Sequence, residues 1–167
     1  MRHDPNCSSR GVDVALLVPE SVDRAFALLQ HALPDVTLHD WRDFVREQHA
    51  ATGDRPAHRG ILVARDRRGV ILGLAIFQHL RDLRHHQVLQ VDLCVVLDLL
   101  HRQNVAERLI AELEARAEHL ACQAVHFALP RGLSGDNSEW MASLLTDRGH
   151  IVESRVFCKR IDPAGRT

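Results

Sequence analysis

The chain has 167 residues, a length at which one domain with a single hydrophobic core is expected. Hydrophobic residues make up 46% and charged residues 26%, a composition that excludes disordered, collagen-like and coiled-coil chains. Lys and Arg number 21 against 22 Asp and Glu, so the charge balance favours neither nucleic acid nor an anionic membrane as a partner. The chain has no tyrosine, which excludes any chemistry that uses a phenol.

Two features indicate the compartment. No apolar run reaches the roughly 18 residues needed to cross a bilayer, and the first residues, MRHDPNCSSR, lack the apolar stretch of a signal peptide. The cysteines Cys7, Cys94, Cys122 and Cys158 form no Cys-x-x-Cys pair, which is typical of reduced structural thiols. We therefore expect a cytoplasmic protein that binds no membrane.

Hydrophobic periodicity and turn residues divide the chain into strands and helices. The expected elements are a strand over 12–18, a helix from Pro19 to Leu29, a helix from Leu38 until the breakers Thr52, Gly53 and Pro56, strands over 61–64 and 70–77 joined by a charged loop ending in Gly69, a strand over 88–97, a helix from Asn104 to Leu120, a strand over 124–129, a helix after Asp136 and a strand over 151–161. No repeat or long linker interrupts them. We expect a single domain over 12–161, with a flexible segment over 1–11 and a tail over 162–167.

The most informative junction joins the strand over 88–97 to the helix that follows it. It reads Val95-Val96-Leu97-Asp98-Leu99-Leu100-His101-Arg102-Gln103-Asn104-Val105-Ala106-Glu107. A strand that leads into a helix start directs free backbone N–H groups and the positive end of the helix dipole at one point. The junction is therefore a candidate anion site.

The order of elements and this junction resemble the GNAT superfamily, the N-acetyltransferases that use acetyl-coenzyme A, over roughly residues 12–161. The resemblance implies an α/β (α+β) fold with a mixed, mostly antiparallel central sheet and helices on both faces. The implied order is β-α-α-β-β-β-α-β-α-β.

The resemblance also implies a coenzyme A site, because the family holds the pyrophosphate at this junction with the pattern Arg or Gln, two residues, Gly, one residue, Gly or Ala. His101 takes the first position, Asn104 takes that of the first glycine, and Ala106 matches the last. Asparagine tolerates left-handed φ better than other non-glycine residues, although its Cβ would crowd the phosphate. The implied cofactor-binding residues are Cys94, Val95 and Val96 toward pantetheine, His101, Arg102, Gln103, Asn104, Val105, Ala106 and Glu107 toward pyrophosphate, and Asn137 at the family's helix-start asparagine.

Asp92 takes the position of the family's general base, four residues before a valine. A primary amine with a pKa near 10.4 must lose a proton before it attacks, which costs roughly 4 to 5 kcal/mol at neutral pH. A nearby carboxylate can accept that proton directly or through water. The alternative is that Asp92 is an ordinary surface carboxylate of the sheet. A period of two places Gln90, Asp92 and Cys94 on one strand face.

The family's usual general acid is a tyrosine, and its position is Leu145 here. That role passes to Ser143, Cys158, a histidine or water, or is absent. The histidines His79, His85 and His86 lie close in sequence, but structural zinc sites have tighter Cys/His sets, so we expect no metal.

The sequence thus favours an N-acetyltransferase that moves an acetyl group from acetyl-coenzyme A to a primary amine by direct attack. The acceptor is a small-molecule or peptide amine, and exposed strand edges favour a homodimer. The alternative is a catalytically degenerate GNAT-fold module that binds coenzyme A or another protein.

Overall fold

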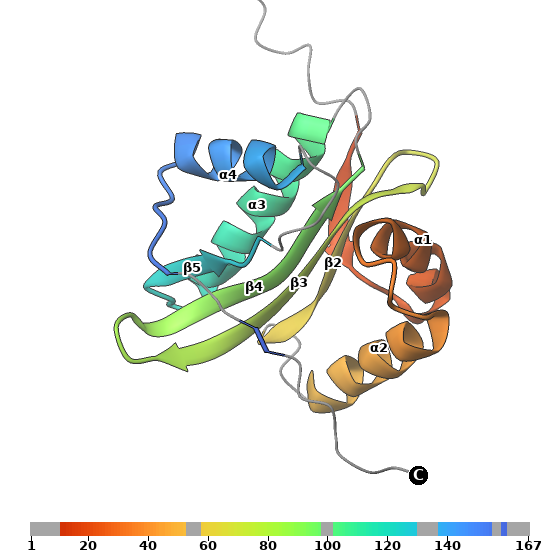
Figure 1. The fold of residues 1–167 in the computed structure, drawn as a ribbon, viewed down its shortest axis with the longest axis horizontal. Coiled ribbons are helices and arrows are strands. Elements are labelled where there is room, and N and C mark those ends of the chain that lie inside the picture. The colour runs from red at the N-terminus through yellow and green to blue at the C-terminus, as the bar shows by residue number, and fades with distance from the viewer. Residues whose placement is uncertain (1–10, 53–57, 98–101, 130–136, 155–157, 160–167) are drawn as a thin grey trace, which may run out of the picture.

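The computed structural model describes residues 11–52, 58–97, 102–129, 137–154 and 158–159. Its elements, shown in Figure 1, are β1 (Asp13–Leu16), a 3-10 turn (Pro19–Ser21), α1 (Val22–Ala32), α2 (Leu38–Thr52), β2 (Arg59–Arg65), β3 (Ile71–Asp82), β4 (His86–Val96), α3 (Arg102–His119), β5 (Ala124–Phe127) and α4 (Asn137–Asp147). Residues 1–10 and the expected tail at 162–167 lie outside these ranges.

The strands form one sheet in the order β1-β2-β3-β4-β5. All neighbouring pairs are antiparallel except β4 and β5, which are parallel. The parallel pair is joined through α3, since parallel strands need a long crossover connection. The expected mixed, mostly antiparallel sheet is confirmed.

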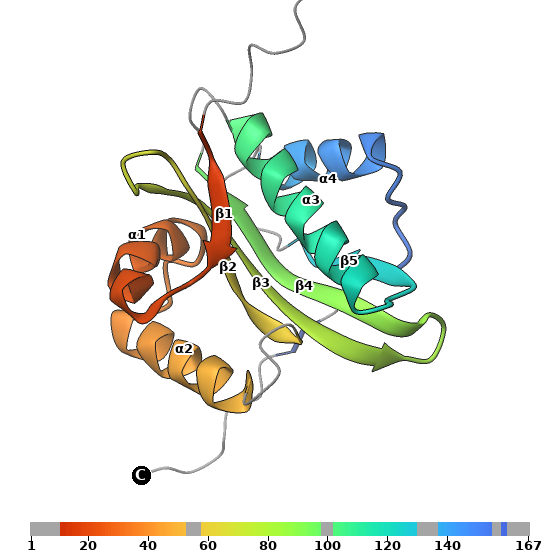
Figure 2. The ribbon, with the colours of Figure 1, turned by 180° about the vertical axis from the view of Figure 1, so that it is seen from behind.

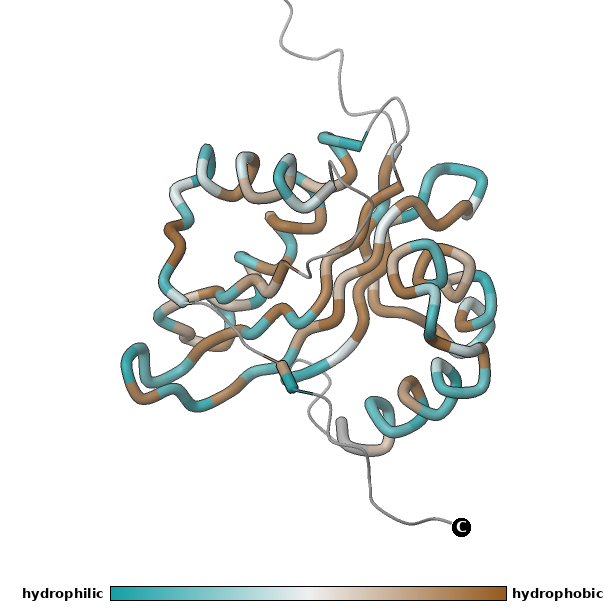
Figure 3. The backbone as a smooth tube through the Cα atoms, in the orientation of Figure 1, coloured by the Kyte–Doolittle hydropathy of each residue, from teal (hydrophilic) through white to brown (hydrophobic). Residues whose placement is uncertain are grey.

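Helices cover both faces of this sheet (Figures 1 and 2). On one face α1 and α2 pack against Ile61, Val63, Leu74, Ile76, Leu93 and Val95. On the other face α3 and α4 pack against Leu62, Ala64, Ala75, Phe77, Leu89, Val91, Cys94 and Val96. The central strands are therefore apolar on both sides where the helices cover them, and Figure 3 shows the hydrophobic colour concentrated in that part of the sheet.

Trp41 fixes the two helices of the first face to each other. Its ring is 1% exposed, and its Nε1 donates to the Val22 carbonyl at the start of α1 over 2.8 Å. Since a buried indole N–H needs an acceptor, this bond sets how α2 lies on α1.

An aspartate side chain accepts backbone amides in the turn of each of two hairpins. In the first, Asp66 Oδ1 accepts the amides of Arg68 and Val70, and Gly69 has a φ of +78°, which only glycine adopts easily. In the second, Asp82 Oδ1 accepts the amides of Arg84 and His85. The second hairpin is longer than predicted because β3 runs on to Asp82.

The expected strand over 151–161 is wrong in the part of it that the structure describes. Residues 151–154 and 158–159 have no regular conformation, and the side chains of Ile151 and Val152 are 79% and 87% exposed. The apolar residues that suggested a strand bury little surface, because the segment passes over the short edge strand β5 instead of extending the sheet.

Membrane spanning is not supported by the helices in the described ranges: none is long and apolar enough for it.

Candidate active site where β4 leaves β5

The site begins where the parallel pairing of β4 with β5 stops. The register runs from Val88 opposite Ala124 to Val91 opposite Phe127, and the Ala128 amide donates to the Val91 carbonyl over 2.8 Å. β4 continues to Val96, and within the described ranges no strand pairs with it on that edge beyond Val91. The pairing stops here because β5 ends at Phe127.

A β-bulge lies at the same point. Val91 pairs with Phe77 and Leu93 pairs with Ile76, so Asp92 is an extra residue with no partner in β3. Such a bulge bends its strand and disrupts the ladder locally. The residue that the sequence singled out as the base is therefore the inserted residue of a bulge, just past the last residue of β4 that pairs with β5.

The bulge changes which face each later residue of β4 occupies. Val91 packs with the α3 core, Leu93 with the α1–α2 core and Cys94 again with the α3 core. The prediction that Gln90, Asp92 and Cys94 share one face is wrong for Cys94, because a simple period of two does not continue through an inserted residue.

Asp92 lies on the α1–α2 side of the sheet, in contact with two amide side chains. Gln78 Nε2 donates to Asp92 Oδ2 over 2.8 Å, and Gln90 also bonds to this carboxylate. Part of the residue reaches solvent, yet partial burial raises the pKa of Asp92 above its ordinary value, against the lowering effect of the two hydrogen bonds. A carboxylate with a raised pKa is a better proton acceptor than a free one.

These amides belong to a polar row that crosses four strands. Arg59 is opposite Gln78, Gln78 is opposite Gln90, and Gln90 is opposite His126. All four side chains are half-buried, and the next row toward the α1–α2 core is apolar. The row was not singled out from the sequence, because its members come from separate strands and only the register aligns them.

The Cys94 side chain is a core group. It is 3% exposed, and burial raises the pKa of its thiol to about 12, so the thiol stays neutral. The backbone amides of this stretch alternate between the two edges of β4. Leu97 donates its amide to Leu72 of β3 over 2.9 Å. Since alternate residues of a strand direct their amides to opposite edges, the amides of Cys94 and Val96 point to the other edge, where the pairing with β5 ends at Val91.

The start of α3 follows directly. Arg102 is its first residue, and its guanidinium lies 4.6 Å from the centre of the Trp140 ring of α4. Gln103 and Glu107 are joined by a 3.0 Å side-chain bond, while the side chains of Val105 and Ala106 are buried in the core. His101 lies outside the described residues.

The helix limits which amides are available to an anion. The N–H groups at the start of a helix have no partner within it, here those from Arg102 to Asn104. The amides of Ala106 and Glu107 come in the second turn, where helix geometry gives them the carbonyls of Arg102 and Gln103. Of the predicted residues from Arg102 to Glu107, only those of the first turn have backbone amides that helix geometry leaves without an intrahelical partner.

The structure also describes three other positions that the family resemblance singled out. Asn104 is within α3 and is not among the described residues with positive φ, so left-handed backbone is not what its position requires. Asn137 begins α4, but its side chain lies outside what the structure describes. Leu145, at the family's tyrosine position, is 5% exposed in the α3-side core.

Comparison with known proteins agrees with this geometry. A family model described as the acetyltransferase (GNAT) family matches residues 23–131. Curated proteins gave no match.

Solved structures with the same fold include an aminoglycoside N-acetyltransferase AAC(6')-Iy in complex with CoA, at 17% identity, a TM-score of 0.73, and coverage of 93% of this chain and 99% of that one. A ribosomal-protein-alanine N-acetyltransferase from Brucella melitensis biovar Abortus 2308 has 22% identity, a TM-score of 0.68, and coverage of 90% and 99%. The aminoglycoside 6'-N-acetyltransferase AAC(6')-Ih from Acinetobacter baumannii has 17% identity, a TM-score of 0.68, and coverage of 91% and 100%.

Proposed function

This chain belongs to the GNAT acetyltransferase family, and we propose that it transfers an acetyl group from acetyl-coenzyme A to a primary amine with Asp92 as the general base. The observation that carries the proposal is the bulge at Asp92, a carboxylate next to the point where the pairing of β4 with β5 ends.

The residues around this point suit the donor. The first-turn amides of α3 and the Arg102 guanidinium favour a pyrophosphate, since helix N-termini and arginine both bind phosphate oxygens. The edge of β4 at Cys94, beyond the pairing with β5, suits an extended amide chain such as pantetheine. Acetyl-coenzyme A supplies an activated thioester there.

Asp92 takes up the proton that the acceptor must lose. The protonated amine is attracted to the carboxylate by charge, and its proton passes to Asp92 directly or through one water so that the nitrogen can attack. Gln78 and Gln90 fix the carboxylate for this purpose, because each donates to it from a neighbouring position of the sheet.

The nucleophile belongs to the acceptor. A cysteine nucleophile requires a thiolate, and the only cysteine at this point, Cys94, is a buried neutral thiol in the described part of the chain. Leu145 has no group to protonate the leaving thiolate, so water serves, which the modest thiol pKa of about 8.5 permits.

The acceptor class is a small-molecule or peptide amine. The polar row from Arg59 to His126 lies beside Asp92 on the side where the acceptor would approach. We keep a cytoplasmic location in the proposal because Cys94, Cys122 and Cys158 are free thiols.

The first test is acetyl-coenzyme A binding and turnover. We expect the donor to raise the melting temperature, and thiol release to follow when a panel of polyamines, amino sugars and peptide amines is supplied. Asp92→Asn should lower kcat/KM by about 100-fold or more at an unchanged donor Kd. The matched control is Asp43→Asn, an exposed carboxylate of α2 paired with Arg46, which should change neither value.

Two outcomes would contradict the proposal. An unmoved melting temperature at millimolar donor would remove the cofactor. Donor binding without acetyl transfer to any amine class would instead favour a binding module.

A further inference from the structure

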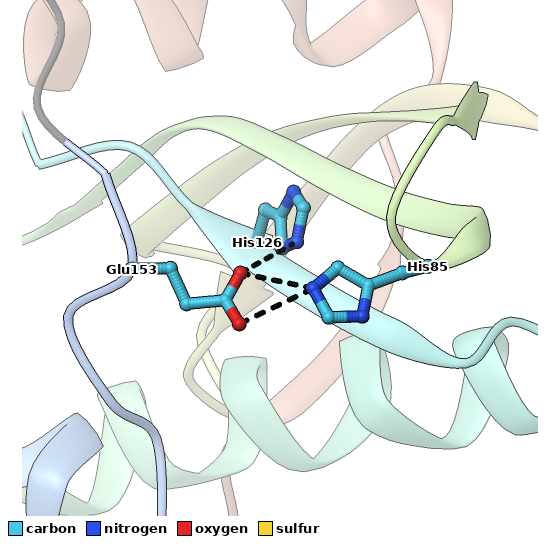
Figure 4. Close-up of side chains that lie close together, drawn as sticks. All are labelled: His85, His126 and Glu153. Atoms are coloured by element: carbon cyan, nitrogen blue, oxygen red, sulfur yellow. Dashed lines mark hydrogen bonds and ion pairs between the residues drawn. The ribbon is translucent and has the colours of Figure 1, made fainter.

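A second polar cluster lies on the same face of the sheet as Asp92, where the turn of the β3–β4 hairpin and the segment after α4 meet β5. It consists of His85 from that turn, His126 from β5 and Glu153 from the segment after α4 (Figure 4). The three residues come from three separate parts of the chain. Their potential ligand atoms all lie within 4.8 Å of one another.

The distances approach those of a metal site. His85 Nε2 is 2.9 Å from Glu153 Oε2, and His126 Nε2 is 3.8 Å from the same oxygen. In a tetrahedral zinc site with bonds of about 2.0 to 2.2 Å, ligand atoms lie roughly 3.3 to 3.6 Å from each other. Shifts of less than about 1 Å would therefore bring the atoms to the spacing that zinc requires.

The His126 ring provides an independent reason to expect a ligand. Its Nε2 atom is buried and makes no hydrogen bond to any residue that the structure describes, because the 3.8 Å to Glu153 Oε2 is too long for one. Buried polar atoms are almost always bonded, so an unsatisfied nitrogen facing a carboxylate and a second imidazole requires a partner. A metal ion placed between the three groups would accept its lone pair.

The surrounding chain holds the three groups in place. Asp82 Oδ1 accepts the amides of Arg84 and His85 at 2.7 and 2.8 Å, which fixes the turn that carries His85. His126 alternates along β5 with Val125 and Phe127, which pack on the α3 side, so it points to the opposite face.

Glu153 reaches this face because the chain crosses the edge of β5. His150, three residues earlier, is still on the α3 side, where its ring contacts Phe127 and its Nε2 lies 3.2 Å from Glu114. The segment is thus attached to both faces of the edge strand, and the cluster is its attachment on the second face.

From this arrangement we propose that His85, His126 and Glu153 bind a divalent transition-metal ion, with zinc as the best match. Two imidazoles and one carboxylate are a donor set that zinc uses, and they leave a fourth position for water. The side chains are 25%, 29% and 30% exposed, which gives an ion access from solvent. The bound ion ties the segment after α4 to the sheet. This proposal does not depend on acetyl transfer.

The sequence did not reveal this set. His85 was considered there with His79 and His86, but in the structure His79 pairs with His58, their Nδ1 atoms 2.9 Å apart. The ligands that accompany His85 are 41 and 68 residues away from it, so no short spacing connects them.

The test is a zinc titration of the whole, chelator-treated protein against a chromophoric competitor. We expect one zinc ion per chain, bound at least about 10-fold more weakly by Glu153→Gln and by His126→Gln, since even second-shell losses cost that much. Two matched controls should bind as the wild type does: Glu114→Gln, which alters the carboxylate beside His150, and His79→Gln, which alters the other unsatisfied imidazole. Circular dichroism confirms that each variant is folded.

Cobalt gives the second readout. Co²⁺ in the wild type should show the visible absorption of a tetrahedral nitrogen and oxygen site, and Glu153→Gln should lose it. The proposal is overturned if zinc does not bind saturably, if the two ligand variants bind it as the wild type does, or if a thiolate-to-cobalt band assigns the ion to a cysteine.

Discussion

Two polar sites occupy the same face of β4 and β5, one around Asp92 and one between β5 and the β3–β4 turn, and they are built in different ways. The Asp92 site lies within regular strands, and its bonds to Gln78 and Gln90 follow from sheet register. The cluster of His85, His126 and Glu153 joins a turn, an edge strand and an irregular segment. The first site is held by the core beneath it, whereas the second is held by its own polar contacts.

Deleting Asp92 should have the largest effect on acetyl transfer, because it alters only the first of the two sites. Without the inserted residue, Val91, Leu93 and Cys94 alternate regularly between the two cores, so the hydrophobic pattern is preserved. The deletion removes both the base and the bend of β4, so we expect acetyl transfer to fall below the level of Asp92→Asn, by more than about 100-fold. Steady-state kinetics and the melting temperature check this.

The matched control is deletion of Leu93. It also restores the register, but it moves Asp92 into the buried position of Leu93, so this variant should unfold more easily. Equal stability of the two deletions would show that the assignment of faces is incorrect.

Trp41→Ala tests how much the packing of α1 and α2, which cover the Asp92 face, contributes to the stability of the fold. Truncation of this buried ring, 1% exposed, should lower the free energy of unfolding by about 3 to 5 kcal/mol. Urea denaturation measures the change. Trp41→Phe keeps most of the volume and loses the bond to Val22, so a smaller loss is expected, on the order of 1 kcal/mol. A loss as large as that of alanine would mean that the hydrogen bond, not packing, dominates.

Gln78→Met alters the Asp92 site without touching its charge. The hydrogen bond from Gln78 lowers the pKa of Asp92, so its removal raises that pKa further. The acid limb of the pH profile of kcat/KM should then move to higher pH, because the base is protonated over a wider range. Gln30→Met, at an exposed position of α1, serves as the control. An acid limb that stays in place would remove Asp92 as the titrating group.

The smallest effect concerns stability and pH. Because burial raises the folded-state pKa of Asp92, the fold favours its protonated form. That stabilisation is complete below the unfolded-state pKa and is lost as the pH rises through the folded-state pKa. Asp92→Asn should therefore be at least as stable as the wild type at neutral pH, with the advantage disappearing in acid. Denaturation across this pH range measures it, and a less stable variant at neutral pH would contradict the sign.

The regular elements were predictable because their signals are local. The apolar spacing after Asn104 and the stripe of Trp41, Phe44 and Val45 predicted α3 and α2 from adjacent residues alone. The strand expected at 151–161 is wrong in its described part because a local signal is not enough for a strand. Its residues are apolar enough locally, but a strand also needs a partner edge, and the described residues 151–154 cross β5 instead.

By itself, the sequence determined the order of elements, the resemblance to the GNAT family and the choice of Asp92, because periodicity and motif position are properties of neighbouring residues. Only the tertiary structure decided that Asp92 is the bulge residue, that Cys94 faces the core, and that His126 lies opposite Gln90 and beside His85. These facts depend on register between strands and on where a chain crosses a sheet edge. Both are set by contacts between residues far apart in the sequence, which no local pattern records.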